Sequence, residues 1–117
     1  MFVYENLKVY QKAFEVHSEV YHFIKTKQHD LPGYLKSQLG RSCLSIMLNI
    51  AEGSGKITNK DRRNFFSIAR GSAFETASVI QFLFSENEIS RSEGESAYTR
   101  LDEISKMLFS MIRNLER

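Results

Sequence analysis

The sequence predicts an all-helical fold, an antiparallel up-down four-helix bundle. Apolar residues recur three and four positions apart through four long segments, which is the period of a helix. One proline and six glycines interrupt the 117 residues, and no alternating strand pattern or low-complexity tract is present. Because the connections are short, consecutive helices are expected to be antiparallel neighbours within one domain, residues 1–117.

The first helix is expected over residues 5–27 and carries two apolar seams. Together the seams cover about 200° of its circumference at about 100° per residue, whereas a small bundle normally requires a narrower stripe from each helix. We therefore expect a second packing surface, covered by another copy of the chain in a homo-oligomer. Val9, Val16 and Phe23 of the second seam are the predicted oligomer interface. The first seam is Leu7, Tyr10, Phe14, His17, Tyr21 and Ile24, and the second is Val9, Ala13, Val16, Val20 and Phe23.

The second helix is expected over residues 33–53. Asp30-Leu31-Pro32-Gly33 breaks the chain before it, since proline is acceptable in the first turn of a helix. Gly53-Ser54-Gly55 is expected to end it, because glycine tolerates the left-handed conformation of a helix cap.

The third and fourth helices are expected over residues 59–86 and 91–116. Thr58-Asn59-Lys60-Asp61 and Ser90-Arg91-Ser92-Glu93 resemble capping boxes, which mark helix starts. In the third helix the core line is predicted at Phe65, Ala69, Ala73, Thr76, Ile80 and Leu83, widened by Phe66, Ala77 and Phe84.

The second helix carries a narrow polar stripe that is either a buried hydrogen-bonded network or a functional surface. We expect a network that fixes helix register, with Arg41 paired to Glu75 across helices, because an unpaired buried charge costs several kcal/mol. A functional pocket is the competing interpretation. The predicted network consists of Arg41, Ser45, Asn49, Glu52, Ser72 and Glu75.

Charge is distributed unevenly along the chain. Residues 36–70 carry seven Lys or Arg against two Asp or Glu, a balance of +5, whereas residues 71–105 carry two against seven, a balance of −5. This asymmetry is typical of an anionic partner for the basic part, of head-to-tail contact between copies, or of ordinary solvated charge. No aromatic stacking platform is expected, because the phenylalanines fall at core spacing. The candidate nucleic-acid-binding residues are Lys56, Lys60, Arg62, Arg63 and Arg70.

The chain carries no pattern typical of an enzyme, a metal site or a cofactor site. Cys43 is the lone cysteine and falls among apolar residues, so we expect a buried, reduced and unreactive thiol. Glu19-Val20-Tyr21-His22 has the Glu-x-x-His spacing of di-iron bundles, but it occurs once and on the polar side of its helix. No secretory signal or membrane span is present, and we expect a cytoplasmic protein.

Two motifs resemble a known family. They resemble the bacterial four-helix bundle proteins encoded within intervening sequences of large-subunit ribosomal RNA genes, whose relatives include the accessory variability proteins of diversity-generating retroelements. The resemblance implies an up-down bundle that assembles into ring-like homopentamers, with no established enzymatic activity. The retroelement relatives bind a reverse transcriptase and nucleic acid through a basic surface, which implies such a role for the five basic residues above. The motifs are Leu39-x-Arg41-Ser42-x-x-Ser45-Ile46-x-x-Asn49-Ile50-Ala51-Glu52-Gly53 and Phe65-x-x-Ile68-Ala69-Arg70-Gly71-Ser72-x-x-Glu75.

Two functional hypotheses follow. In the first, the chain is a non-enzymatic homo-oligomeric bundle that binds RNA or a ribonucleoprotein through its basic surface. In the second, it is an oligomeric protein–protein scaffold with no nucleic-acid role.

Overall fold

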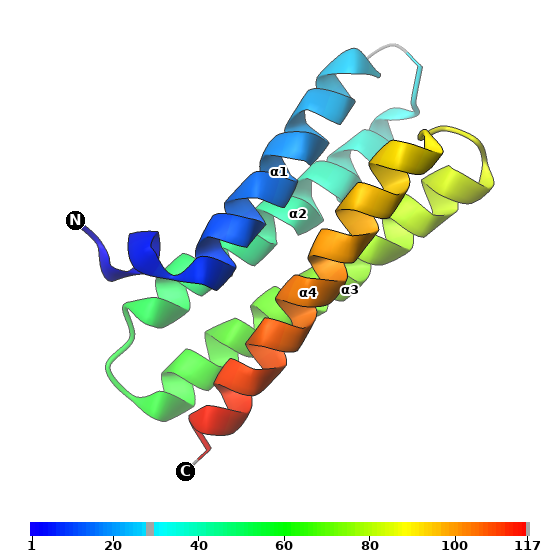
Figure 1. Cartoon of the computed structure of the whole chain (residues 1–117). Coiled ribbons are helices and arrows are strands. Elements are labelled where there is room, and N and C mark those ends of the chain that lie inside the picture. The colour runs from blue at the N-terminus through cyan, green and yellow to red at the C-terminus, as the bar shows by residue number, and fades with distance from the viewer. Residues whose placement is uncertain (28–29, 117) are drawn as a thin grey trace.

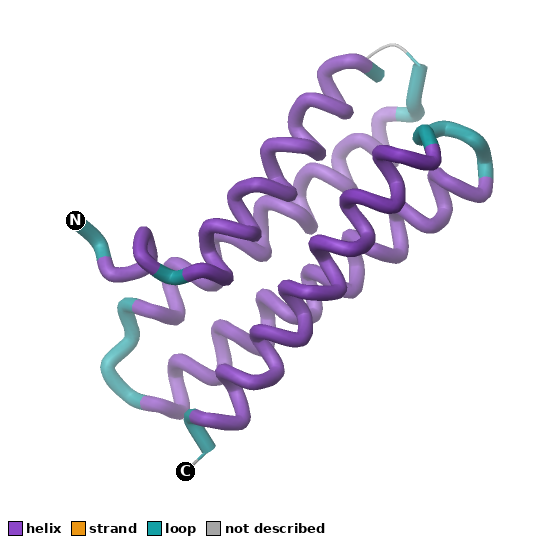
Figure 2. The backbone as a smooth tube through the Cα atoms, in the orientation of Figure 1, coloured by secondary structure: helices purple, strands orange, loops and turns teal. Residues whose placement is uncertain are grey.

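The computed structural model describes residues 1–27 and 30–116, which form four long helices and no strand (Figures 1 and 2). Each helix packs against two neighbours, so that α4 closes the bundle against α1. The bundle measures 45 × 25 × 22 Å. Its helices are α1 (Lys8–Thr26), α2 (Gly33–Ser54), α3 (Asn59–Ser85) and α4 (Arg91–Asn114).

The chain enters α1 through a separate short turn. Val3–Asn6 form a 3₁₀ helix, and the Glu5 carboxylate accepts a hydrogen bond from the Phe2 backbone N–H at 2.8 Å. The predicted start of the first helix at residue 5 is therefore three residues early.

Side chains cap α3 and α4 as the sequence predicts. Thr58 Oγ1 accepts a hydrogen bond from the Asp61 backbone N–H at 3.1 Å. Ser90 and Glu93 form a complete capping box, with bonds of 3.1 and 3.3 Å. These bonds satisfy backbone N–H groups that lack a partner inside the helix.

Gly53 acts through close packing and not as a left-handed cap. It lies buried inside α2, which ends at Ser54 and is capped by Gly55 in a right-handed conformation with φ of −90°. A Cβ atom added at Gly53 would meet Phe66 Cε1 at 2.8 Å, closer than real contacts allow. The missing side chain therefore lets α2 and α3 approach each other.

The prediction that Val9, Val16 and Phe23 form an oligomer interface is wrong. These side chains are only 2%, 0% and 6% exposed, because they lie in the core of their own chain. In the other seam Phe14 and Tyr21 face outward, 55% and 51% exposed, while Leu7, Tyr10 and Ile24 pack partly buried against the core. Apolar surface beyond what the core needs is therefore present on α1, but it lies on the side of Phe14 and Tyr21.

The predicted core line of α3 is confirmed at the buried Ala69, Ala73, Thr76, Ile80 and Leu83, and differs from the structure at its first residue. Phe66 is buried while Phe65 is half-buried, and Phe84 is 45% exposed near the end of α3. Phe74, on the outer side of the same helix, is 55% exposed. The expectation that the phenylalanines serve the core is therefore wrong for a substantial part of them.

Replacing Gly53 tests the close approach of α2 and α3. We expect Gly53→Ala to lower the free energy of unfolding by roughly 1–3 kcal/mol, because the new methyl group overpacks against Phe66. Urea denaturation measures the change. Gly71→Ala is the matched control: nothing lies within 4 Å of the added carbon, so better helix propensity should stabilise the protein by about 0.5–1 kcal/mol. Equal effects at both positions would contradict the packing role.

Candidate nucleic-acid interface

Small polar side chains join α2 to α3. Ser45 Oγ and Ser72 Oγ lie 2.8 Å apart, and Asn49 donates to the Ser45 carbonyl and hydroxyl at 2.8 and 3.0 Å. One turn away, Thr76 Oγ1 donates to Ser42 Oγ at 2.8 Å and also lies 2.7 Å from the Ser72 carbonyl oxygen. Ser45, Asn49 and Ser72 therefore belong to an inter-helix network as predicted, together with Ser42 and Thr76.

The charged members of the predicted network lie outside it. Arg41 is exposed and makes no hydrogen bond or ion pair with any residue that the structure describes. Glu75 is exposed and accepts from Gln38, and Glu52 pairs with Lys56 of the following loop at 3.7 Å. The predicted Arg41–Glu75 pair is therefore absent. At about 100° per residue, Arg41 and Glu52 lie further round α2, toward solvent, than Ser45 and Asn49.

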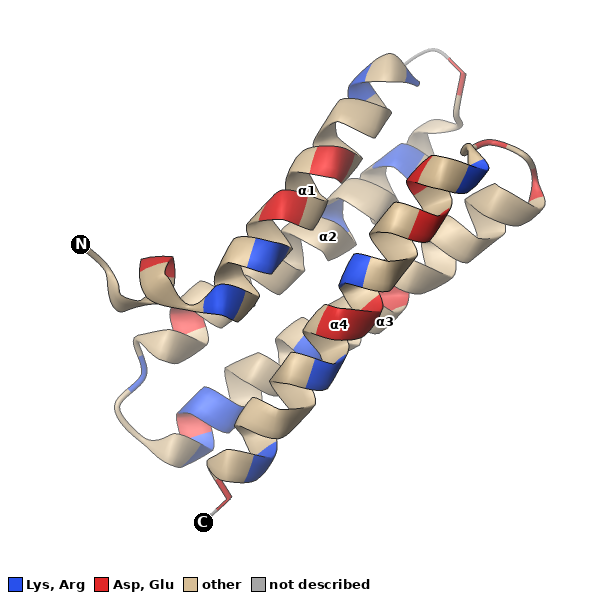
Figure 3. Ribbon diagram, viewed as in Figure 1, with Lys and Arg blue, Asp and Glu red and all other residues tan. Residues whose placement is uncertain are grey.

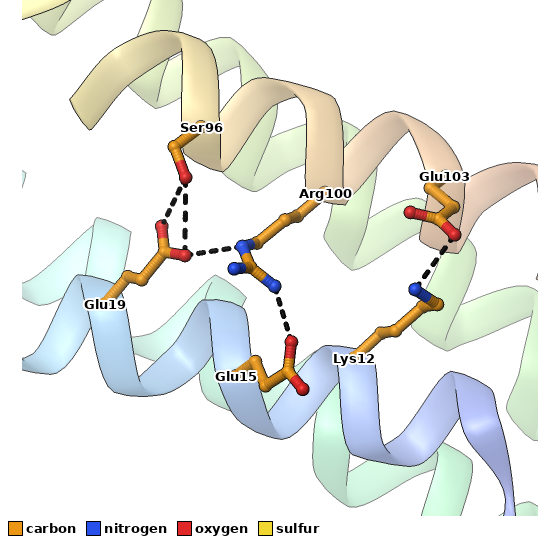
Figure 4. Close-up of polar contacts among 6 residues, drawn as sticks. All are labelled: Lys12, Glu15, Glu19, Ser96, Arg100 and Glu103. Atoms are coloured by element: carbon orange, nitrogen blue, oxygen red, sulfur yellow. Dashed lines mark hydrogen bonds and ion pairs between the residues drawn. The ribbon is translucent and has the colours of Figure 1, made fainter. Parts of the chain in front are cut away.

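Charged side chains close the seam between α1 and α4 (Figure 4). Arg100 of α4 reaches between Glu15 and Glu19 of α1, at 2.5 Å from each carboxylate, and Lys12 pairs with Glu103 at 2.9 Å. All five side chains are at least one-third exposed, so each pair contributes little to stability.

A cleft of about 450 Å³ lies beside this seam, lined by apolar side chains together with Glu19, His22 and Glu93. Glu19 is already held by Arg100, and Glu93 by the capping box. Within residues 1–27 and 30–116, no group of three His, Cys, Asp or Glu residues is arranged to hold a metal ion.

Two of the predicted nucleic-acid-binding residues stiffen the loop between α2 and α3. Arg62 Nε donates to the Lys56 carbonyl at 2.7 Å, which ties the start of α3 to the loop. The Lys56 ammonium lies 4.8 Å from the centre of the Phe65 ring and pairs with Glu52. Local contacts thus occupy both cations.

The other three predicted residues lie toward α4. Arg63 Nη1 donates to the Leu115 carbonyl at 2.6 Å, which fixes the start of α3 against the end of α4. Lys60 is exposed and lines a shallow depression with Arg63 and Ile112. Figure 3 shows Lys and Arg gathered where α3 begins and α4 ends.

Arg70 lies between two exposed aromatic rings that sequence reasoning missed. Its guanidinium carbon is 4.8 Å from the Phe74 ring centre and 5.4 Å from that of Phe109, and Arg113 lies 5.8 Å from Phe109. Phe74 is 55% and Phe109 47% exposed. The expectation that no aromatic platform exists is therefore wrong. We call Lys60, Arg63, Arg70, Phe74, Phe109 and Arg113 the Arg/Phe surface.

A local signal for this surface is present in the sequence. Arg70 and Phe74 are four residues apart, as are Phe109 and Arg113, and this spacing places each pair on one helix face. The contact between the two pairs depends on how α3 and α4 are aligned, which neither helix specifies by itself.

The buried titratable groups indicate no nucleophile. Burial, with a smaller contribution from the charge of Glu19, raises the pKa of the Cys43 thiol to about 12. The thiol is free and buried, as predicted, and is protonated at neutral pH. Burial also lowers the pKa of His17, so this imidazole tends to be neutral.

Among the described residues, no helix is long and apolar enough to cross a membrane.

Comparisons with known proteins define the class of the chain. The model of the 23S rRNA-intervening sequence protein family matches residues 5–110, and the chain belongs to this family. This confirms the resemblance based on the two motifs in the second and third helices. The chain matches no protein of curated function.

The fold is shared with a solved structure from Bacteroides thetaiotaomicron, a protein of unknown function from the S23 ribosomal protein family. It is 30% identical to this chain with a TM-score of 0.81, and the match covers 89% of this chain and 97% of that one.

Substitutions at Thr76 and Arg41 separate the structural part of the polar stripe from the exposed part. We expect Thr76→Val to lower the free energy of unfolding by about 1–3 kcal/mol, because it removes the hydroxyl that joins Ser42 to α3. Arg41→Gln should change it by no more than about 0.5 kcal/mol. Thermal or urea unfolding measures both changes. A larger loss of unfolding free energy for Arg41→Gln would show that Arg41 belongs to the network after all.

Proposed function

We propose that this chain is a non-catalytic, self-associating helical-bundle protein that binds RNA through the Arg/Phe surface. The observation that carries the proposal is the gathering of cations where α3 begins and α4 ends (Figure 3), next to the exposed rings that flank Arg70.

The charge balance at this end of the bundle supports an anionic partner. Six cations stand there against three acidic side chains, and the exposed Lys60 makes no ion pair within the described part of the chain. RNA phosphates are attracted by such a surface, and counterions released on binding supply much of the affinity. The cations are Lys56, Lys60, Arg62, Arg63, Arg70 and Arg113, and the acids are Glu52, Asp61 and Glu116.

The chemistry of the interior supports the non-catalytic part of the proposal. A nucleophilic cysteine needs a lowered pKa and access to solvent, whereas Cys43 is buried with its pKa raised to about 12. The carboxylates beside the α1/α4 cleft are held in ion pairs and a helix cap, where they perform structural roles.

An apolar face supports self-association. Phe14 and Tyr21 of α1 and Leu44 and Leu48 of α2 are exposed on two neighbouring helices. We call these four residues the α1/α2 apolar face. Its burial against another copy would remove large apolar side chains from water, which favours association. The family resemblance leads us to propose a ring of five copies.

Salt dependence tests RNA binding. If about four phosphates are neutralised, the slope of log affinity against log salt should be about −3, and affinity should fall roughly fifty-fold between 50 and 200 mM salt. Fluorescence anisotropy with a labelled single-stranded RNA measures this. Lys60→Gln and Arg113→Gln should each reduce the slope by about 0.7, because each removes one phosphate contact.

Arg91→Gln is the control, because Arg91 lies at the other end of α4 and pairs with Glu95. It should leave the slope unchanged. An absence of salt-dependent binding by the unmodified protein would refute the RNA-binding proposal.

Sizing in solution tests self-association. The unmodified protein should elute as five copies of the 13.6-kDa chain, and Phe14→Gln combined with Leu48→Gln should release monomers. Phe82→Gln is the matched control, since Phe82 is 48% exposed on α3 and lies outside the α1/α2 apolar face. A monomeric unmodified protein would rule out the self-associating part of the proposal.

A further inference from the structure

We infer that the Arg/Phe surface recognises single-stranded RNA by stacking bases on Phe74 and Phe109 while Arg70 binds a phosphate. This inference rests on the proposed RNA-binding function and adds to it a mode of recognition. It predicts a requirement for unpaired bases, which charge attraction alone does not impose.

The two rings are about half exposed, with Arg70 over part of each, so a base would stack on the part of each ring that solvent reaches. Phe74 projects from α3 and Phe109 from α4, and about half of each side chain is in contact with solvent. No other aromatic ring among the described residues stacks on either of them. Every nucleobase has a flat face, and stacking on an aromatic side chain is a common way to bind single strands.

Arg70 is poised to bind an anion. Its guanidinium is flanked by both rings, yet it makes no hydrogen bond or ion pair with any residue in the described ranges. Its Nε atom is enclosed and lacks an acceptor. Because the neighbouring rings displace water, the attraction of this cation for an anion is less screened than that of a fully hydrated side chain. A phosphate would bind through the terminal Nη groups of Arg70 in charge-assisted geometry, because the enclosed Nε atom is out of its reach.

The arrangement favours RNA over an acidic peptide. A peptide carboxylate would satisfy Arg70 but would leave both rings in water. A nucleotide brings a phosphate and a flat apolar face together, which matches a cation set between two rings. Lys60 and Arg113 extend the positive charge along the same end of the bundle, where further phosphates of the same strand would lie.

Acidic side chains of α4 limit how far an RNA strand can extend beyond the Arg/Phe surface. Asp102 lines the groove beyond Phe74, together with Tyr98 and Ser105, and pairs with Lys106 at 2.9 Å. Glu95 lines a separate pocket about two turns nearer the start of α4 and pairs with Arg91. A polyanion is therefore expected to extend over the surface from the start of α3 only as far as Phe74.

A double-stranded nucleic acid does not fit this surface as well. In a duplex the base faces are stacked on each other and are unavailable to protein rings, whereas the bases of a single strand are open. The inferred ligand is accordingly a single strand or an unpaired loop.

Two oligomers of equal charge provide the decisive comparison. One is a twelve-nucleotide oligoadenylate, and the other is a twelve-unit abasic ribose-phosphate strand. The unmodified protein should bind oligoadenylate at least about tenfold more tightly, because only that strand gains the stacking energy.

Phe74→Leu and Phe109→Leu should each reduce binding of oligoadenylate about tenfold and leave binding of the abasic strand unchanged. Leucine keeps apolar contact with the bundle while it removes the ring. Phe82→Leu is the control, because Phe82 is similarly exposed on α3 but has no cation contact. Arg70→Gln should weaken both strands and reduce the salt slope by about 0.7.

A second measurement needs no variant. An oligoadenylate with 2-aminopurine at one position should show a change in fluorescence on binding as its base leaves the strand stack and stacks on a phenylalanine. Circular dichroism of each variant confirms that the bundle is folded.

The outcomes distinguish the inference from the proposed function. Equal binding of the two strands, or leucine variants that behave like the unmodified protein, would overturn base stacking and leave RNA binding intact. Polyglutamate that competes as well as RNA would identify an acidic-peptide site and would also overturn the inference. If neither strand binds at low salt, the inference and the RNA-binding function fall together.

Discussion

The close contact between α2 and α3 is the constraint on which the rest of the bundle depends. Gly53 makes room for Phe66, and the Ser45–Ser72 and Ser42–Thr76 hydrogen bonds cross the same seam. At Gly53 the seam leaves no space for a side chain beside Phe66. Its polar groups are satisfied by one another, which removes the cost of burying them.

A narrow interior determines where the large side chains lie. The sequence contains nine phenylalanines and five tyrosines, but within the described residues Phe23 and Phe66 are the aromatic side chains buried in the core. Ala13, Ala69, Ala73 and Ala97 occupy other positions in this core. Many of the aromatic side chains are therefore left half-exposed on the outside, where they form the α1/α2 apolar face and the Arg/Phe surface.

The sequence was sufficient to predict the fold class, the approximate helix bounds and both capping motifs, because these depend on local spacing and local hydrogen bonds. It did not show which seam of α1 faces inward. Both seams are apolar and adjacent, and the smaller side chains of the Val9–Val16 seam fit the narrow interior. Arg41 illustrates the same limit, since a residue about 40° further round the helix than Ser45 lies in water instead of in the network.

The candidate site was only partly predictable for a related reason. The cations near the start of α3 are evident in the sequence, but Phe109 and Arg113 come from a helix some forty residues later. The contact of Phe109 with Arg70 is set by the alignment of α3 against α4, to which the Arg63–Leu115 hydrogen bond contributes. A pattern within one helix contains no information about that alignment.

The ion pairs between α1 and α4 have a consequence for experiments on this protein. Arg100 and Lys12 join these helices through partly exposed charges, whereas the α2/α3 seam is joined by neutral groups. Dissolved ions screen exposed charge pairs and leave neutral contacts nearly unaffected. Raising the ionic strength to detach a polyanion therefore also weakens these pairs, although the buried apolar side chains of α1 keep the helix in place, and the conformation of the bundle is best followed in parallel with a salt titration.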